Sequence, residues 1–270
     1  MPHAIKMIEE MGKDGLVVLL PESQGCPADD LLGFFAKKFP KNTNAALKAV
    51  VMPGQGLSTS PSSGGLPNAA LIGVDGTVLW AGNPNGAPKK IEELTADEIK
   101  KIKGGWGKSP DAKKARAQMY GKGNLAEAAK ILAAAEQGVK PEHKEDFDAA
   151  KAELEVRYAA RKKGVTTLTE KARLTEAQKA ALALQKDVKG KAEWETEVAA
   201  LVDGFKTPEM DKELKADQAL MKIIAGWGDK APADEAATAL DKFAKKNEGT
   251  KAANRAKEFA AAAKFNPNAR

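Results

Sequence analysis

The chain has 270 residues, 43% of them hydrophobic and 30% charged, with a single cysteine and a formal net charge of +6. This length could support two hydrophobic cores, and the composition is that of a globular chain rather than a disordered one. No apolar run approaches the roughly 20 residues that cross a bilayer, so we expect no membrane span. One cysteine cannot form an internal disulfide and does not indicate the redox compartment.

The first residues, "MPHAIKMIEEMGKDG", carry acidic side chains and no long apolar run, which is unlike a signal peptide. The localisation therefore stays open. It is periplasmic or otherwise extracytoplasmic if a signal peptide has been removed, and cytoplasmic if not.

The first forty residues alternate element types. The segment "PHAIKMIEEMG" (2–12) has helical spacing of its apolar residues, and "LVVLL" (16–20) is an apolar run typical of a buried strand. The segment "PADDLLGFFAKKF" (27–39) begins with proline and acidic residues, which helix N-termini favour. Cys26 therefore lies where a strand and loop give way to a predicted helix.

Three more strands and a helix follow in the first hundred residues. "LKAVVM" (47–52) predicts a strand, and "AALIGVDGTVLWAG" (69–82) predicts a β-hairpin that turns at Asp75 and Gly76. "KKIEELTADEIKKI" (89–102) has the periodicity of an amphipathic helix. We expect a small sheet of about four strands flanked by helices.

Strand signals vanish from about Gly104 onward, and apolar residues then recur at helical intervals. The clearest of these apolar sets are Phe147, Ala150, Leu154 and Tyr158; Trp194, Val198, Leu201 and Phe205; and Leu220, Ile223, Ile224 and Trp227. We predict two domains, residues 1–103 and an α-helical, repeat-like domain of residues 104–270.

Charge also divides the chain. Residues 1–105 carry eleven Lys, eleven acidic residues and no Arg, so the whole excess of +6 lies downstream. Lys, Glu and Asp alternate there along Ala-rich stretches, as on solvated helix faces, without Arg clusters or interleaved aromatic residues. We expect no nucleic-acid partner.

The sequence has no cofactor or metal motif with the required spacing between its residues. "GGWGKSP" (104–110) hints at a phosphate-binding loop, but Ile102 stands where that pattern needs glycine. His3, His143 and the lone cysteine offer no metal-ligand spacing, and neither histidine lies in a motif that would position it as a catalytic base. We expect neither cofactor nor metal. Trp106 and Trp227 lie in similar sequence surroundings. We expect both rings to pack the end of a helix against a hydrophobic core.

The strand "LVVLL", the cysteine at a helix start and the later "GGLPNAALIGVDGTVLWAG" (64–82) together resemble the thioredoxin-like family, in the redoxin branch related to periplasmic thiol-disulfide proteins. The resemblance covers residues 1–103 and implies an α/β fold. In that family a cis-proline before the strand-turn-strand faces the active thiol. The resemblance thus implies that Cys26 is a candidate nucleophile, Pro67 the cis-proline and Leu66 a substrate contact.

The active-site motif of that family is incomplete here. The chain reads Cys26-Pro27-Ala28-Asp29, so a carboxylate takes the place of the resolving cysteine. A helix N-terminus lowers the pKa of a thiol, whereas the neighbouring Asp29 and Asp30 oppose the thiolate. Without a second thiol, a mixed disulfide must wait for an external one, so rapid disulfide cycling is not expected.

Peroxiredoxins share the fold and have a similar Cys-Pro-Thr-Glu motif, but they need an arginine beside the cysteine. The first arginine of this chain is Arg116, outside the predicted domain.

The second half resembles tetratricopeptide-type helix-hairpin repeats. "YGKGNLAEAAKIL" (120–132) is similar to the turn and second helix of one repeat, and "NEGTKAANRAKEFAAAA" (247–263) to a closing one. Such repeats imply a surface for partner proteins. The leading hypothesis is a degenerate thioredoxin-like protein that acts in protein interaction or assembly, through a protein partner or by self-association. The alternative is a monothiol thiol-disulfide oxidoreductase that uses Cys26.

Overall fold

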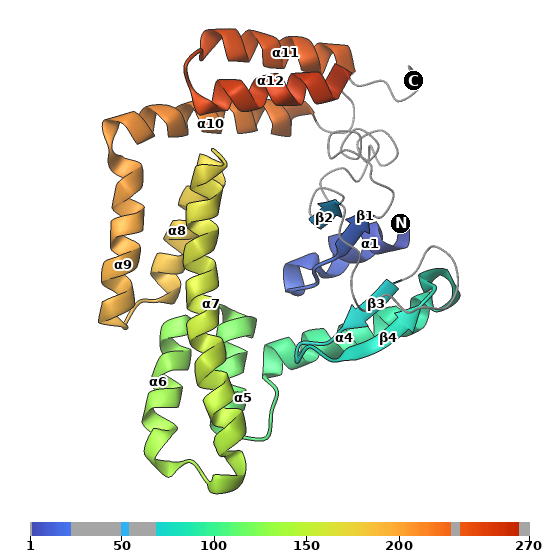
Figure 1. Cartoon of the computed structure of the whole chain (residues 1–270), viewed down its shortest axis with the longest axis vertical. Coiled ribbons are helices and arrows are strands. Elements are labelled where there is room, and N and C mark those ends of the chain that lie inside the picture. Colours follow the sequence, from blue (N-terminus) through green and yellow to red (C-terminus); the bar gives the residue numbers. More distant parts are fainter. Residues whose placement is uncertain (1, 23–49, 54–68, 228–232, 265–270) are drawn as a thin grey trace. The chain divides into compact units, whose positions relative to one another are not determined.

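The computed structural model describes residues 2–22, 50–53, 69–227 and 233–264 (Figure 1). These residues form two compact units, one ending at Ile102 and one comprising Lys103–Lys264. Helices make up most of the described chain.

The described part of the first unit contains two α-helices, two 3₁₀ turns, of which the second is Pro84–Gly86, and four short strands. Helix α1 (Pro2–Met11) continues into a 3₁₀ turn (Gly12–Asp14), and α4 (Pro88–Gly104) follows the strands. Strands β1 (Leu19–Glu22) and β2 (Val50–Pro53) pair in parallel, with Leu19 opposite Val50. Strands β3 (Ala69–Ile72) and β4 (Val78–Gly82) pair antiparallel, with Ala69 opposite Gly82.

The predicted hairpin turn at Asp75 and Gly76 is confirmed. The Gly73 N–H donates to the Thr77 carbonyl oxygen at 2.8 Å, and the Asp75 carboxylate accepts the Thr77 N–H at 3.0 Å. Gly76 has a φ of +83°, a left-handed conformation that glycine adopts without strain. Helix α4 holds this turn, because the buried Glu98 carboxylate accepts the Val74 N–H at 2.8 Å.

The prediction of an α/β thioredoxin-like domain is wrong. The described strands form two separate two-stranded ladders, one parallel and one antiparallel, instead of one sheet of about four strands. No residue of β3 or β4 is fully buried, and Ile72 and Val78 are 50% and 52% exposed. Strands at the centre of an α/β sheet are covered on both faces, so these short strands do not have that environment. Apolar runs and turn residues predict strands, but they do not determine which strands pair.

The described residues of the second unit form helices joined by turns and short loops, with no strand among them. Its helices in chain order are α5 (Pro110–Arg116), α6 (Leu125–Ala135), α7 (Lys144–Glu170), α8 (Leu174–Asp187), α9 (Ala192–Asp203), α10 (Pro208–Trp227), α11 (Ala233–Lys246) and α12 (Lys251–Lys264). A π-helical turn (Ala117–Lys122) extends α5.

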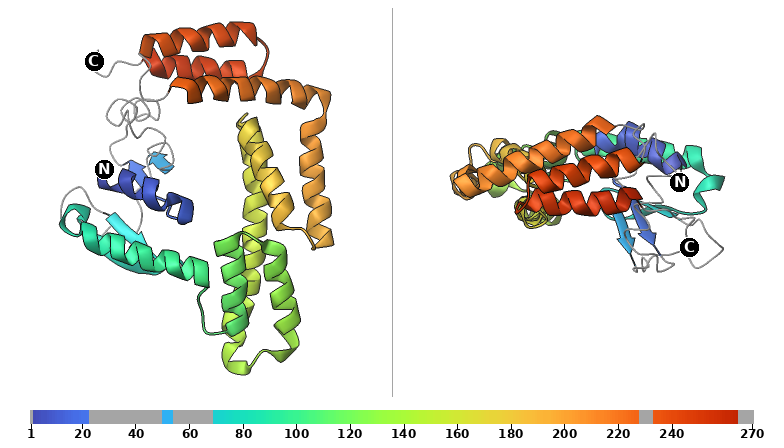
Figure 2. Two further views of the ribbon diagram at one scale, coloured as in Figure 1. Left: turned by 180° about the vertical axis from the view of Figure 1, so that it is seen from behind. Right: turned by 90° about the horizontal axis from the view of Figure 1, so that it is seen from above.

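The helices of this unit pack against neighbours in the sequence and against helices two positions along the chain. Helices α5, α6 and α7 contact one another, α8 contacts α7 and α9, and α10 contacts α8 and α12. Helices α11 and α12 lie antiparallel and side by side, joined by a short turn (Figures 1 and 2). Ser109 and Asn124 cap α5 and α6, accepting the N–H of Ala112 at 3.3 Å and of Glu127 at 2.9 Å, as N-cap side chains do.

Helix α7 contributes to two hydrophobic clusters. Phe147, Ala150, Leu154 and Tyr158 are all buried, as their helical spacing predicted, and they pack with α5, α6 and Trp194. Val165, further along α7, packs instead with Ala177, Ala181, Val202 and Phe205. A third cluster joins α10, α11 and α12 around Leu220, Leu240 and Phe243. Within the described ranges, no helix combines the length and apolarity that a membrane crossing requires.

Candidate functional site

The residues implied by the thioredoxin-like resemblance lie outside the described residues. Cys26, Leu66 and Pro67 all fall in segments 23–49 and 54–68, which the structure does not describe. It therefore does not test whether these residues come together, and their roles remain predictions. Among the described residues no group of three His, Cys, Asp or Glu side chains is arranged to hold a metal ion.

An open groove lies where α6, α7 and the turn between α8 and α9 converge. It has a volume of about 480 Å³. Its lining residues are Ala126, Ala129, Lys130, Leu132, Ala133, Glu136, Lys151, Leu154, Glu155, Gly190 and Lys191. The lining residues thus span more than 60 positions of the sequence, from Ala126 to Lys191.

Small side chains form the α6 side of this groove. Ala126, Ala129 and Ala133 follow one another at intervals of three and four residues, which places them on one face of the helix. Leu132 and Leu154 belong to the buried cluster beneath. Alanine on this face lets another backbone or side chain approach α6 closely, and the leucines make the floor apolar.

Charged side chains border the groove. Lys151 of α7 pairs with Glu136 next to α6, and Lys191 pairs with Glu155 of α7 at 3.3 Å. Lys130 of α6 is exposed and has no ion pair with any described residue. The border thus carries three ammonium groups and two carboxylates, of which both carboxylates are already matched.

Lys191 is held by an aromatic stack as well as by Glu155. Its ammonium nitrogen lies 3.4 Å from the centre of the Trp194 ring, which is a close cation–π contact. Trp194 stacks on Tyr158 with a centroid distance of 4.2 Å and an interplanar angle of 11°. Lys162 also lies over the Tyr158 ring, at 5.4 Å from its centre. The buried Trp194 ring, stacked on the buried Tyr158 ring, therefore helps to fix the position of Lys191 at the groove.

The Tyr158 phenol stays neutral in this stack. Burial raises its pKa most, and its hydrogen bond to the Glu197 carboxylate at 2.9 Å and the charge of that carboxylate raise the pKa further. The phenol donates to Glu197, which also accepts from Lys162 at 2.5 Å. We interpret Tyr158 as a packing residue that supports the groove.

A carboxylate–arginine clamp fixes the chain before α5. Asp146 accepts the Ser109 N–H at 2.7 Å and an Arg116 Nη1–H at 2.6 Å. The same Nη1 donates to the Trp106 carbonyl oxygen at 3.1 Å, and Arg116 also makes two bonds of 2.8 and 2.9 Å to Glu153. Arg116 is 2% exposed, so its charge is matched within the protein.

A second clamp repeats this arrangement before α8. The buried Asp217 accepts the Thr175 N–H at 2.7 Å and pairs with Arg255, whose Nη1 donates to the Ala172 carbonyl oxygen at 2.9 Å. In both clamps the bound carbonyl and N–H are three residues apart. Ala172 has a φ of +56°, the left-handed region where a non-glycine residue is uncommon. The clamp holds this backbone in place.

The segment "GGWGKSP" has a structural role in this arrangement. A Cβ on Gly105 would lie 1.9 Å from the Lys113 carbonyl oxygen, and one on Gly107 would lie 2.4 Å from Arg116 Nη1. Gly105 therefore makes room for the backbone of α5, and Gly107 makes room for Arg116 and Asp146 of the clamp. Trp106 is half-buried, and its ring lies 4.8 Å from that of Tyr120. The side chain of Trp227, its counterpart in the sequence, is outside the described residues.

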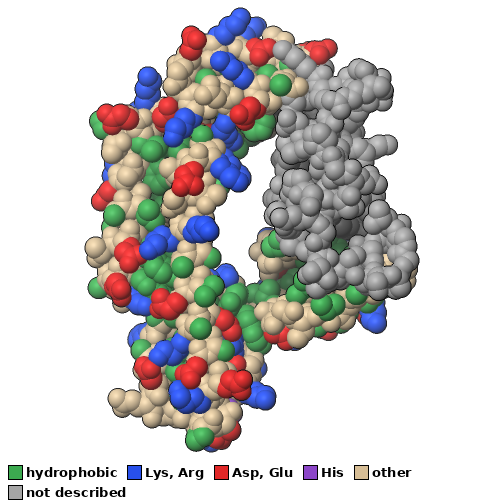
Figure 3. Space-filling model, in the orientation of Figure 1, with side chains coloured by type: hydrophobic (Ala, Val, Ile, Leu, Met, Phe, Trp, Pro, Cys, Tyr) green, Lys and Arg blue, Asp and Glu red, His purple; other side chains and the backbone are tan. Residues whose placement is uncertain are grey.

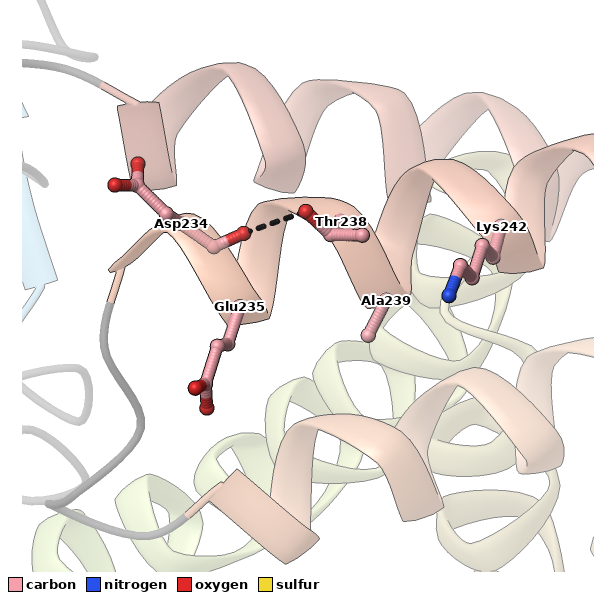
Figure 4. Close-up of a pocket in the computed structure, with 5 residues that line it drawn as sticks. All are labelled: Asp234, Glu235, Thr238, Ala239 and Lys242. Atoms are coloured by element: carbon pink, nitrogen blue, oxygen red, sulfur yellow. Dashed lines mark hydrogen bonds between the residues drawn. The ribbon is translucent and has the colours of Figure 1, made fainter.

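A second depression lies on α11 (Figure 4). Its described lining consists of Asp234, Glu235, Thr238, Ala239 and Lys242, all from that one helix. The Thr238 hydroxyl donates to the Asp234 carbonyl oxygen at 2.8 Å, which is a bond within the helix. A single described wall does not define a ligand site.

Neither the groove nor the clamps were predicted from the sequence. The spacing of Ala126, Ala129 and Ala133 was a visible signal, because small residues on one helix face permit close approach. The clamps had no local signal, since Arg116 and Asp146 are 30 residues apart and Asp217 and Arg255 are 38 apart.

The second unit is thus a helical assembly with an open groove, bordered by lysines and glutamates. Comparison with protein-family models, with curated proteins and with solved structures finds no match to this chain.

Proposed function

We propose that the helical unit is a protein-interaction module that binds a peptide segment of a partner protein in the groove between α6, α7 and the α8–α9 turn. The observation that carries this proposal is the groove itself. Its volume of about 480 Å³ falls in the range of ligand sites, and it combines an apolar floor with charged borders.

The groove is largely preformed. Lys191 is held by Glu155 and Trp194, and Lys151 is held by Glu136. Side chains that are ordered before binding lose less conformational entropy when a ligand arrives, which favours affinity. Their fixed positions also provide directional contacts at the border.

The lining chemistry supports binding rather than catalysis. The ionisable side chains that line the groove are Lys130, Glu136, Lys151, Glu155 and Lys191. The hydrogen bond with Glu136 raises the pKa of Lys151, so this amine stays protonated at neutral pH. A nucleophilic lysine needs a lowered pKa instead. We therefore assign the ionisable groups to recognition.

A peptide-display library selected on the full chain tests the proposal. Ala133→Trp fills the groove, whereas Ala134→Trp places the same indole on the next residue of α6, which is also exposed but does not line the groove. We expect peptides that bind the parent chain and Ala134→Trp but lose at least tenfold in affinity for Ala133→Trp.

Thermal unfolding followed by circular dichroism shows whether both variants fold. If no selected peptide distinguishes two folded variants, the groove is not the binding site and the proposal fails.

A further inference from the structure

We propose that the ligand of this groove is an acidic peptide segment, with a carboxylate on Lys130 and an apolar side chain over the alanine face of α6. This inference rests on the proposed function and adds the chemistry of the partner.

The first argument is the balance of charge at the border. Glu136 and Glu155 each have a lysine partner, whereas Lys130 has none among the described residues. A ligand carboxylate would give Lys130 an ion-pair partner without displacing an existing ion pair. A basic ligand would have to compete with Lys151 or Lys191 for a glutamate. The unmatched charge therefore favours an acidic partner.

The second argument is the position of Lys130 on α6. It lies between Ala129 and Ala133, both of which line the groove. A peptide that places a carboxylate on Lys130 can therefore lay a neighbouring apolar side chain on these alanines. The close spacing of a charged and an apolar contact predicts that both come from one short segment.

The third argument is the charge of the whole unit. Residues 103–264 contain 32 Lys and Arg against 26 Asp and Glu, a net charge of +6. A net positive unit attracts acidic segments at long range and accelerates their association. On the face shown in Figure 3, basic and acidic side chains are interspersed over the helices. The unpaired positive charge of Lys130, rather than the net charge of the unit, then determines which ligand binds in the groove.

The experiment is to read the sequences of the library peptides that bind in the groove, and then to measure their affinity for Lys130→Glu by fluorescence anisotropy. We expect enrichment of Asp and Glu beside an apolar residue. We expect Lys130→Glu to weaken these peptides by roughly tenfold or more, since a charge-assisted hydrogen bond is lost and a like charge is added. The affinity should also fall as salt rises.

Lys163→Glu is the matched control. Lys163 is an exposed lysine of α7 that does not line the groove, so the same change in net charge should leave affinity within about twofold, by screening of distant charges.

The outcomes separate the two proposals. Groove-dependent peptides that are neutral or basic, or that tolerate Lys130→Glu, overturn the acidic ligand and leave the interaction module standing. A dimer in light scattering that Ala133→Trp dissociates would make a second copy the occupant and also overturn it. An equal loss with Lys163→Glu would show nonspecific attraction to the charge of the unit and likewise overturn it. Absence of any groove-dependent peptide defeats both proposals.

Discussion

The carboxylate of Asp217 accepts the backbone N–H of Thr175 at 2.7 Å, across 42 residues of sequence. Asp217 lies on α10, Thr175 near the start of α8, and Arg255, the ion-pair partner of Asp217, on α12. One buried carboxylate therefore joins three helices. A buried charge is tolerated only when its hydrogen bonds are complete, so this residue is sensitive to substitution.

Asp217→Ala should lower the free energy of unfolding by about 3 kcal/mol, because Arg255 and the Thr175 N–H lose their acceptor. Asp217→Asn should have a smaller effect, since its amide oxygen can still accept the N–H. Urea unfolding followed by circular dichroism measures both. Asp211→Ala is the control, because Asp211 forms an exposed pair with Lys215 on the same helix and should change stability by less than about 0.5 kcal/mol.

Acid should destabilise the helical unit partly through Asp146. Burial raises the pKa of Asp146, but the Ser109 N–H and Arg116 outweigh it, so the pKa is lowered. A carboxyl with a lowered folded-state pKa stabilises the fold above its unfolded pKa of about 3.9, and this stability is lost as pH falls through the folded value.

Asp146→Asn should therefore be less stable than the parent at pH 6. The difference should begin to shrink below about pH 4 and should be lost only as pH falls through the still lower folded-state pKa of Asp146. Urea midpoints measured at several pH values check this. Parallel profiles down to the lowest pH would contradict the role of the carboxylate.

Gly105 and Gly123 allow a matched test of how the room available for a Cβ atom affects stability. Their φ values are +75° and +73°, so alanine suffers similar backbone strain at both, of roughly 1–2 kcal/mol. A Cβ at Gly123 would have its nearest contact at 3.7 Å, against 1.9 Å at Gly105. Gly105→Ala should therefore lower the thermal midpoint clearly more than Gly123→Ala. Equal midpoints would show that the backbone before α5 adapts easily.

The reactivity of Cys26 stays a prediction that alkylation can test. If the cysteine is a residual feature of a binding protein, its rate of alkylation should follow an ordinary thiol pKa of about 8.5. Iodoacetamide labelling followed by mass spectrometry across pH measures this. An apparent pKa well below 8 together with disulfide-reductase turnover would favour the monothiol oxidoreductase.

Local features of this protein could be predicted from its sequence, and long-range ones could not. The hairpin at Asp75 and Gly76 and the buried face of α7 depend on neighbouring residues, and both were predicted. The pairing of the strands was predicted wrongly, because an apolar run does not identify its partner. The groove at Lys130 depends on how α6 and α7 pack against the α8–α9 turn, which no short motif encodes.

The length of α7 has a consequence for the evolution of this unit. Tyr158 belongs to one hydrophobic cluster and Val165 to another, and an uninterrupted helix joins them. Each residue advances a helix by about 100°, so one residue inserted between them would rotate Val165 out of its cluster, whereas seven would nearly restore its direction. The angle about the α7 axis between the two clusters is therefore fixed. An insertion or deletion in α7 between them keeps both clusters only when its length is close to a whole number of helical turns.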